Sequence, residues 1–182
     1  MAMHHPHLRD LLHRVARLLA SEGWGDDLNP TQRAALAYLV RANRFSRAPS
    51  HVADYLAATR GTVSQTLKAL RRKGLVEEAR SETDRRSVVL EPTEAGRACV
   101  GTADALDAAL AGLPEAQAAA LETGLGDLVS DLLKRRGGRS FGICRTCRHH
   151  EGRPDGGHCR LLRVDLAPFE TGQLCHEHAE AA

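Results

Sequence analysis

The sequence predicts a mainly helical protein with one small β-hairpin and a short cysteine-rich segment near its C-terminal end. Three observations lead to this fold class. Apolar residues recur at three- and four-residue steps through most of the first 136 positions, which is the spacing of amphipathic helices. Two short runs rich in Val and Leu enclose a single charged turn. Four of the five cysteines follow residue 140.

The composition agrees with a helical protein and shows where positive charge gathers. Of the 182 residues 42% are hydrophobic but only 3% are aromatic, so the core is built from Leu, Val and Ala, which suits packed helices. The formal net charge of +2 does not by itself indicate nucleic-acid binding. Between Arg41 and Lys73, however, eight Lys or Arg accompany a single acid, Asp54, so this region is locally basic.

Several classes of protein are disfavoured. The chain has no run of eighteen apolar residues and its first residues lack the apolar core of a secretory signal, so we expect a cytoplasmic protein and no membrane partner. Cytoplasmic thiols stay reduced, which favours metal binding or redox chemistry over disulfides. No nucleophile motif, phosphate loop or His-Glu-x-x-His is present, and we therefore expect no enzymatic activity.

Residues 1–28 are predicted to form an N-terminal helix that belongs to a dimerisation scaffold. Its apolar stripe needs a partner and consists of Leu8, Leu11, Leu12, Val15, Leu18 and Leu19. Residues 29–92 are predicted to form the next unit, in which Asn29-Pro30 caps and opens one helix and Pro49-Ser50 opens another.

The stretch from Gly61 to Lys73 is predicted to be a helix that reads DNA. Val63, Leu67 and Leu70 mark its buried face, and Gly74 ends it. The opposite face carries donors and acceptors of the kind that reach base edges and phosphates in a major groove. These candidate DNA-binding residues are Arg60, Thr62, Ser64, Gln65 and Lys68.

A hairpin follows the helix directly. Residues 75–78 and 87–91 are predicted strands, and residues 80–86 form the polar turn between them. A hairpin beside a recognition helix is a wing, so the order of elements predicts a winged helix-turn-helix. Arg85 and Arg86 near its tip are candidates for a minor groove, and Asp84 for holding one of them in place. The alternative is a solvated charged turn.

At the residues KGLVEEARSETDRRSVVLEPTEAGR and NPTQRAALAYLV the chain resembles the MarR (multiple antibiotic resistance regulator) family of winged-helix transcriptional regulators. The resemblance runs from about Leu8 to Leu133. It implies a homodimer that binds pseudo-palindromic operator DNA. In this family a small-molecule effector or a cysteine modification often relieves that binding. Carried over by position, it assigns base reading to the helix face named above, with Asp84 and Arg85 in the wing. Glu91-Pro92-Thr93 departs from the family pattern and alters the strand end.

Residues 93–136 are predicted to supply two further dimerisation helices, 94–111 and 114–136, separated by Gly112-Leu113. Their apolar positions repeat at helical spacing and are Leu106, Leu110, Leu121, Leu125, Leu128, Leu132 and Leu133. Cys99 lies on the first of them. It is predicted to be a buried structural cysteine, whereas a redox role requires an exposed, electropositive setting.

Residues 137–182 are predicted to be a cysteine-rich, metal-binding tail. Cys144 and Cys147 form a Cys-x-x-Cys turn, and Cys159 and Cys175 follow after eleven and fifteen residues to complete a four-sulfur set. Four thiolates suit zinc or, alternatively, an iron-sulfur cluster. Neighbouring His176 or His178 as substitute ligands favours zinc, whereas the unpaired Cys159 and Cys175 favour a cluster.

The sequence thus predicts a dimeric, sequence-specific regulator that a metal site stabilises or modulates. The competing hypothesis is a metal or redox protein, such as an iron-sulfur subunit, whose winged helix is a protein-docking module. The sequence does not name the operator, the target genes, the direction of control or the effector. It also leaves open the choice of metal, the redox role of Cys99 and the replacement of a cysteine ligand by histidine.

Overall fold

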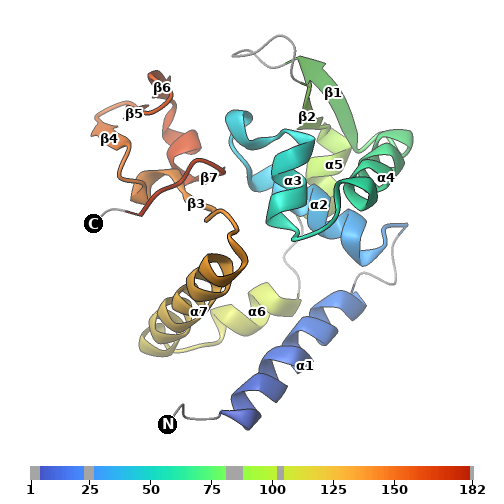
Figure 1. Cartoon of the computed structure of the whole chain (residues 1–182), viewed down its shortest axis with the longest axis vertical. Coiled ribbons are helices and arrows are strands. Elements are labelled where there is room, and N and C mark those ends of the chain that lie inside the picture. The colour runs from blue at the N-terminus through green and yellow to red at the C-terminus, as the bar shows by residue number, and fades with distance from the viewer. Residues whose placement is uncertain (1–4, 23–26, 81–87, 102–104, 181–182) are drawn as a thin grey trace.

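The computed structural model describes residues 5–22, 27–80, 88–101 and 105–180, and within these ranges the protein is mainly helical with three small β-sheets (Figure 1). The elements up to the long C-terminal helix are α1 (Pro6–Glu22), α2 (Pro30–Arg41), η2 (Arg44–Ser46), α3 (Pro49–Tyr55), α4 (Arg60–Arg72), β1 (Val76–Arg80), β2 (Val88–Pro92), α5 (Glu94–Val100), α6 (Ala105–Ala111) and α7 (Glu115–Arg136). In the described ranges no helix combines the length and the apolarity that crossing a membrane requires.

The winged-helix unit is built around α2, α3 and α4. Asn29 caps α2 by a reciprocal pair of hydrogen bonds with Gln32, and Pro30 occupies the first helical turn, as the sequence predicted. Thr59 caps α4 by accepting the Thr62 amide at 3.2 Å. The predicted inward residues of α4 are buried together with Leu36, Tyr38 and Leu39 of α2 and with Val52 and Ala53 of α3.

The wing is a two-stranded antiparallel ribbon in which Val76 pairs with Pro92 and Arg80 pairs with Val88. Pro92, which departs from the family pattern, is therefore the last residue of β2 and does not prevent the strand from forming. The next residue, Thr93, caps α5 and donates its hydroxyl to the Gly74 carbonyl at 2.8 Å. A Cβ on Gly96 would meet the Leu75 carbonyl oxygen at 2.1 Å, so Thr93 and Gly96 together seat α5 on the α4–β1 turn.

The predicted helix 94–111 is two helices. Gly101 caps the end of α5, and the chain resumes as α6 after residues 102–104, which lie outside the described ranges. Cys99 is half-buried against the winged-helix core. The structure thus attaches α5 to the winged-helix unit, while α6, α7 and α1 lie apart from it (Figure 1).

The scaffold helices α1, α6 and α7 leave their apolar faces open. The described residues of α6 and α7 include none that is buried, and Leu18 on α1 is 55% exposed. The exposed apolar side chains on α1 and α7 include Leu8, Leu11, Val15, Leu121, Leu125, Leu128, Val129 and Leu132.

The tail folds into short strands and turns beside α3 (Figure 1). Its elements are β3 (Gly142–Ile143), η3 (Cys144–Thr146), β4 (His150–Arg153), β5 (Gly156–Cys159), β6 (Val164–Leu166), η4 (Pro168–Gly172) and β7 (Leu174–Cys175). β3 pairs with β7, and β4, β5 and β6 form an antiparallel sheet in that order.

Candidate nucleic-acid interface and cysteine cluster

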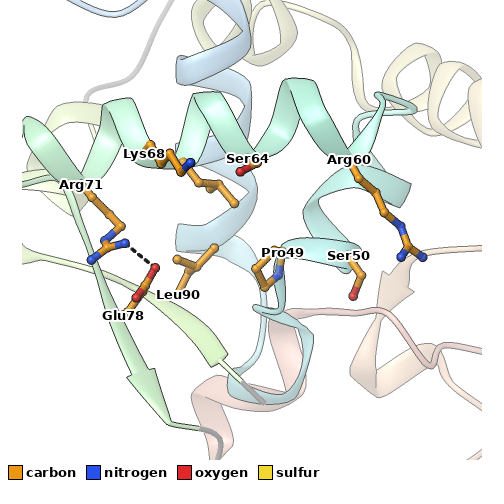
Figure 2. Close-up of a pocket in the computed structure, with 9 residues that line it drawn as sticks. Pro49, Ser50, Arg60, Ser64, Lys68, Arg71, Glu78 and Leu90 are labelled. Atoms are coloured by element: carbon orange, nitrogen blue, oxygen red, sulfur yellow. Dashed lines mark hydrogen bonds and ion pairs between the residues drawn. The ribbon is translucent and has the colours of Figure 1, made fainter. Parts of the chain in front are cut away.

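The outer face of α4 carries a row of exposed polar side chains. Arg60, Ser64 and Lys68 are four residues apart and therefore lie on one side of the helix. They line a groove together with Pro49 and Ser50 at the start of α3 (Figure 2). Leu90 and Glu78 of the wing close its far end, so the groove joins the helix to the hairpin.

Gln65 lies on the adjacent side of α4. With Lys68 it borders a second hollow, which Arg71, Arg72 and Glu78 also line. Arg71 forms an ion pair with Glu78 across the gap between α4 and β1 (Figure 2). Four of the predicted base-reading residues therefore form one continuous surface that extends from the start of α3 to the wing: Arg60, Ser64, Gln65 and Lys68.

Thr62 is separated from that surface. Its hydroxyl lies 2.9 Å from the Thr59 hydroxyl at the helix cap, and its carbonyl accepts a hydrogen bond from Thr66. It borders a hollow on the side of α4 that faces Leu19 of α1 and Pro30 of α2. The structure thus groups four of the five helix residues and places Thr62 elsewhere. Asp84, Arg85 and Arg86 of the wing lie outside the described residues.

Three arginines at the end of α2 and in the connection to α3 differ in their surroundings. Arg41 is exposed. Arg44 pairs with Glu170 of the tail at 2.5 Å. Arg47 is buried, pairs with Glu91 and donates to the Ala42 carbonyl at 3.1 Å, so it joins α2 to the wing instead of facing solvent. Burial lowers its pKa and nearby Glu91 opposes that effect.

The four tail cysteines are buried and come from three segments of the tail. Cys144 and Cys147 form a tight turn in which the Cys147 amide donates to the Cys144 carbonyl at 3.0 Å. Cys159 ends β5 opposite His150, whose own amide donates to the Cys147 carbonyl at 2.9 Å. Cys175 lies on β7, beside the strand that leads into Cys144.

The thiols share one environment. The pKa of Cys144 is raised to about 12, chiefly by burial and then by the neighbouring thiols of Cys175, Cys159 and Cys147. All four cysteines are free thiols. Thiols this close and this buried repel one another when ionised, and a cation among them would reverse that effect, because it stabilises thiolates.

Hydrogen-bond donors point at two of the sulfurs. The Ala179 amide lies 3.4 Å from the Cys147 sulfur. Burial raises the pKa of Cys175, but hydrogen bonds from the Asn43 side chain, the Glu177 amide and the Ser46 hydroxyl to its sulfur lower it. Such donors favour a thiolate, and outer partners of this kind orient metal ligands.

The spacing of the ligands restricts which metal group fits. Within the described part of the chain, no three His, Cys, Asp or Glu side chains are arranged so that they could hold a metal ion. A zinc ion needs its sulfurs 2.3 Å from the metal, and so about 4 Å from one another. The described cysteine side chains do not form such a shell.

The two histidines considered as substitute ligands face other groups. The His176 ring stacks on His51 of α3 with centroids 3.6 Å apart. His178 Nε2 lies 3.0 Å from the Thr146 hydroxyl. Both contacts favour Cys175 over either histidine as the fourth ligand.

Sequence reasoning missed Asn43 and Ser46. They stand in the connection between α2 and α3, more than 100 positions from Cys175, and both are 1% exposed. Asn43 reads locally as a helix cap, and it does accept the Phe45 amide at 3.2 Å. No local pattern indicated that the Asn43 amide also donates to the Leu174 carbonyl of the tail, or that the Ser46 hydroxyl accepts the His176 amide.

Comparison with known proteins finds a similarity to the MarR family in the winged-helix unit. Residues 26–87 match the model of the MarR family. The chain is similar to the crystal structure of Streptococcus pneumoniae FabT in complex with DNA, with a TM-score of 0.57 and 28% sequence identity over 71% of this chain and 94% of that chain. It is also similar to the S. aureus MepR-DNA complex, with a TM-score of 0.54 and 20% identity over 72% of this chain and 99% of the other.

No curated protein sequence matches the chain. More than a quarter of the chain lies outside the match to FabT, which itself is covered almost completely. From residue 26 to residue 87 the chain carries the sequence pattern of the MarR family, and its fold is that of a MarR-like winged helix.

Proposed function

We propose that this protein is a dimeric, sequence-specific DNA-binding transcriptional regulator of the MarR type, and not an enzyme. The observation that carries the proposal is the continuous polar surface of α4, formed by Arg60, Ser64, Gln65 and Lys68 beside the wing. The similarity to FabT, whose structure was determined in complex with DNA, supports it at 28% identity.

The surface divides into two kinds of contact. Gln65 and Ser64 offer neutral donors and acceptors, which suit base edges in a major groove. Arg60 and Lys68 at its two ends suit phosphates or guanine, and the exposed Arg41 suits a phosphate. Thr62 contributes through the helix cap. Arg85 and Arg86 are proposed to reach a minor groove from the wing tip, with Asp84 holding one of them.

The proposed dimer joins two chains through α1, α6 and α7. Apolar side chains such as Leu18, at 55% exposed, and Val129, at 53%, lie along these helices in a single chain. Amphipathic helices gain most of their stability from burying such a stripe, so a second copy is the natural partner. Two joined chains would present two α4 helices to one operator.

The proposed effector site lies between the scaffold and the winged helix. A hollow of about 490 Å³ is lined mainly by apolar groups of α1, α2 and the α3–α4 connection, including Leu19, Ala34 and Leu56. A small apolar molecule there would touch both parts at once. That position would let it shift one relative to the other.

The proposed metal site is formed by Cys144, Cys147, Cys159 and Cys175, and it stabilises or modulates the regulator. Zinc and an iron-sulfur cluster are the two groups that four thiolates suit. The neighbouring histidines favour zinc, which we propose first, and the unpaired Cys159 and Cys175 favour a cluster as the alternative. Anaerobic purification with iron, sulfide and zinc analysis decides between them, since a cluster absorbs visible light and zinc does not.

The cysteine cluster also favours the competing function, a redox protein in which the winged helix docks another protein. Both hypotheses predict bound metal, and only the regulator predicts specific DNA binding. Fluorescence anisotropy with labelled duplexes from the promoter next to the gene, in the presence of excess unlabelled random DNA, separates them. Saturable binding that resists the random DNA supports the regulator, and binding to no duplex at low salt contradicts it.

A further inference from the structure

The short helix η2 packs into the tail. Phe45 of η2 is half-buried and lies against a cluster of buried tail residues that includes Cys159 and Leu166. The guanidinium of Arg44 lies 4.6 Å from the centre of the Phe45 ring and pairs with the buried carboxylate of Glu170 at 2.5 Å. The winged-helix unit therefore contributes a side chain to the core of the tail.

The tail makes the reciprocal contact through β7. Leu174 is 7% exposed and belongs to the winged-helix core cluster that also contains Leu39 of α2. The Asn43 amide donates to the Leu174 carbonyl at 2.9 Å, and the His176 amide donates to the Ser46 hydroxyl at 2.8 Å. Each part thus inserts one side chain into the core of the other, and hydrogen bonds at η2 and at the residue before it fix the joint.

The residue after η2 holds the wing. The Leu90 amide of β2 donates to the Arg47 carbonyl at 3.0 Å, and the buried Arg47 side chain pairs with Glu91 of the same strand. Arg47 Nε also donates to the Ala42 carbonyl at 3.1 Å, at the end of α2. The strand β2 is therefore joined to the same short segment against which the tail packs.

This segment positions the wall of the groove that faces α4. The lining residues outside α4 are Pro49 and Ser50 at the start of α3, and Leu90 and Glu78, which are paired in the wing (Figure 2). Pro49 follows η2 after only two residues, and Leu90 is bonded directly to Arg47. The position of this wall relative to α4 therefore depends on η2, and the tail holds η2.

We propose that the docked tail regulates DNA binding within a single chain, because docking on η2 fixes the wall of the groove opposite α4. The docked tail favours the arrangement in which α3, α4 and the wing contact DNA together, and DNA in turn favours the docked tail. This link is made of packing and hydrogen bonds and needs no bound metal. The effect on DNA rests on the proposed function, whereas the link from the tail to the wing does not.

The first test follows amide hydrogen exchange by NMR in the full-length protein. The Asn43 amide reports docking of the tail, and the Leu90 amide reports the contact between the wing and the end of η2. Leu166→Asp places a charge in the tail core, where Leu166 is 4% exposed, and the control Leu161→Asp places it where the leucine is 47% exposed. We expect both amides to exchange at least about tenfold faster in Leu166→Asp and at the wild-type rate in the control.

A milder change on the tail side is Glu170→Gln. It removes the charge that pairs with Arg44 but keeps an oxygen for the Ala167 amide, which Glu170 accepts at 2.8 Å. Glu151→Gln, on an exposed position of β4, removes the same charge away from the joint and serves as the control. We expect the two reporter amides to exchange faster in Glu170→Gln, by a smaller factor than in the core variant, and at the wild-type rate in Glu151→Gln.

The two reporter amides are expected to change together. Faster exchange at Asn43 without faster exchange at Leu90 would overturn the proposal, as would wild-type exchange at Asn43 in both Leu166→Asp and Glu170→Gln. If Leu166→Asp also speeds exchange throughout α4, the whole unit unfolds in that variant, and Glu170→Gln decides the question.

The second test measures affinity for promoter duplexes at one salt concentration. Coupling between two sites typically changes affinity by about five- to 150-fold, so we expect Leu166→Asp to bind more weakly than Leu161→Asp by a factor in that range. Equal affinities of the two folded dimers would refute the regulation. If the wild type binds no duplex at low salt, the regulator hypothesis and the regulation both fail, and the exchange rates alone decide whether the tail holds the wing.

Discussion

The winged-helix unit and the scaffold helices treat their apolar residues in opposite ways. The winged helix closes its own core, in which Leu36, Leu39 and Leu70 are 0% exposed. In the scaffold Leu18 is 55% exposed and Leu132 is 44% exposed. The core of the winged helix is complete within a single chain. The apolar residues of the scaffold are buried only when a second apolar surface covers them. Folding of the first is therefore independent of assembly, whereas placement of two recognition helices is not.

The tail lies between these extremes. Its buried residues include four cysteines, and one of its two buried leucines, Leu174, is inserted into the core of the winged helix. A segment this small gains too little from apolar burial to fold alone, so docking on the winged helix stabilises it, and the proposed metal would add to that stability.

The largest expected effect is on assembly. Leu128→Asp places a charge in the exposed apolar stripe of α7, and burying it unpaired in an interface would cost several kcal/mol. We expect the protein to become monomeric in sedimentation and to lose operator binding while keeping its winged-helix fold. Thr123→Asp adds the same charge to the opposite side of the helix and should remain dimeric. A monomeric wild type would break the comparison.

The next largest effect is on the self-contained core. In Gly96→Ala the new methyl would overlap the Leu75 carbonyl, at 2.1 Å, and overpacking of this kind costs about 1–3 kcal/mol. We expect chemical denaturation to show that loss. Gly124→Ala is the matched change in α7, where nothing lies within 4 Å of the new methyl, and it should stabilise by about 0.5–1 kcal/mol. Equal responses at both sites would show that α5 is not seated tightly.

A smaller effect is expected on DNA affinity from the surface of α4. Gln65→Ala should weaken operator binding by about 1–3 kcal/mol and relax specificity, because a base contact is lost. Lys68→Ala should reduce the salt dependence if it meets a phosphate. Anisotropy titrations at two salt concentrations measure both effects. Wild-type affinity in both variants would mean that another surface meets DNA.

The smallest effect is expected at the edge of the wing. Arg71 and Glu78 form an ion pair that is nearly half exposed on both sides, so Glu78→Gln should change stability by less than about 1 kcal/mol. It should raise DNA affinity slightly, because an acid leaves the groove and Arg71 is released. Glu77→Gln removes the same charge from the neighbouring position without breaking the pair. A large loss of stability in Glu78→Gln alone would show that the wing depends on this contact.

Local patterns predicted most of the winged helix correctly. The Asn29-Pro30 cap, the buried positions Val63 and Leu67, and the two wing strands all depend on neighbours within a few residues. The division of 94–111 was missed because Ala-rich sequence continues past Gly101, and only the seating of Gly96 shows where α5 belongs.

The sites were predictable only in part. Helical spacing predicted a polar face on α4. The elements that pack around the helix decide that Ser64 and Gln65 border two different hollows and that Thr62 faces α1 and α2 instead. The Cys-x-x-Cys turn identified two thiols. The hydrogen bonds of Asn43 and Ser46 to the tail join distant segments of the chain, and no periodicity in the sequence predicts them.

The claim that two copies present α4 to successive turns of a duplex is tested most directly by hydroxyl-radical footprinting of the operator complex, with its mass measured in parallel. The account predicts two chains per site and two protected segments whose centres lie about one helical turn, roughly 10 base pairs, apart. A single protected segment, or one chain per site, would contradict it.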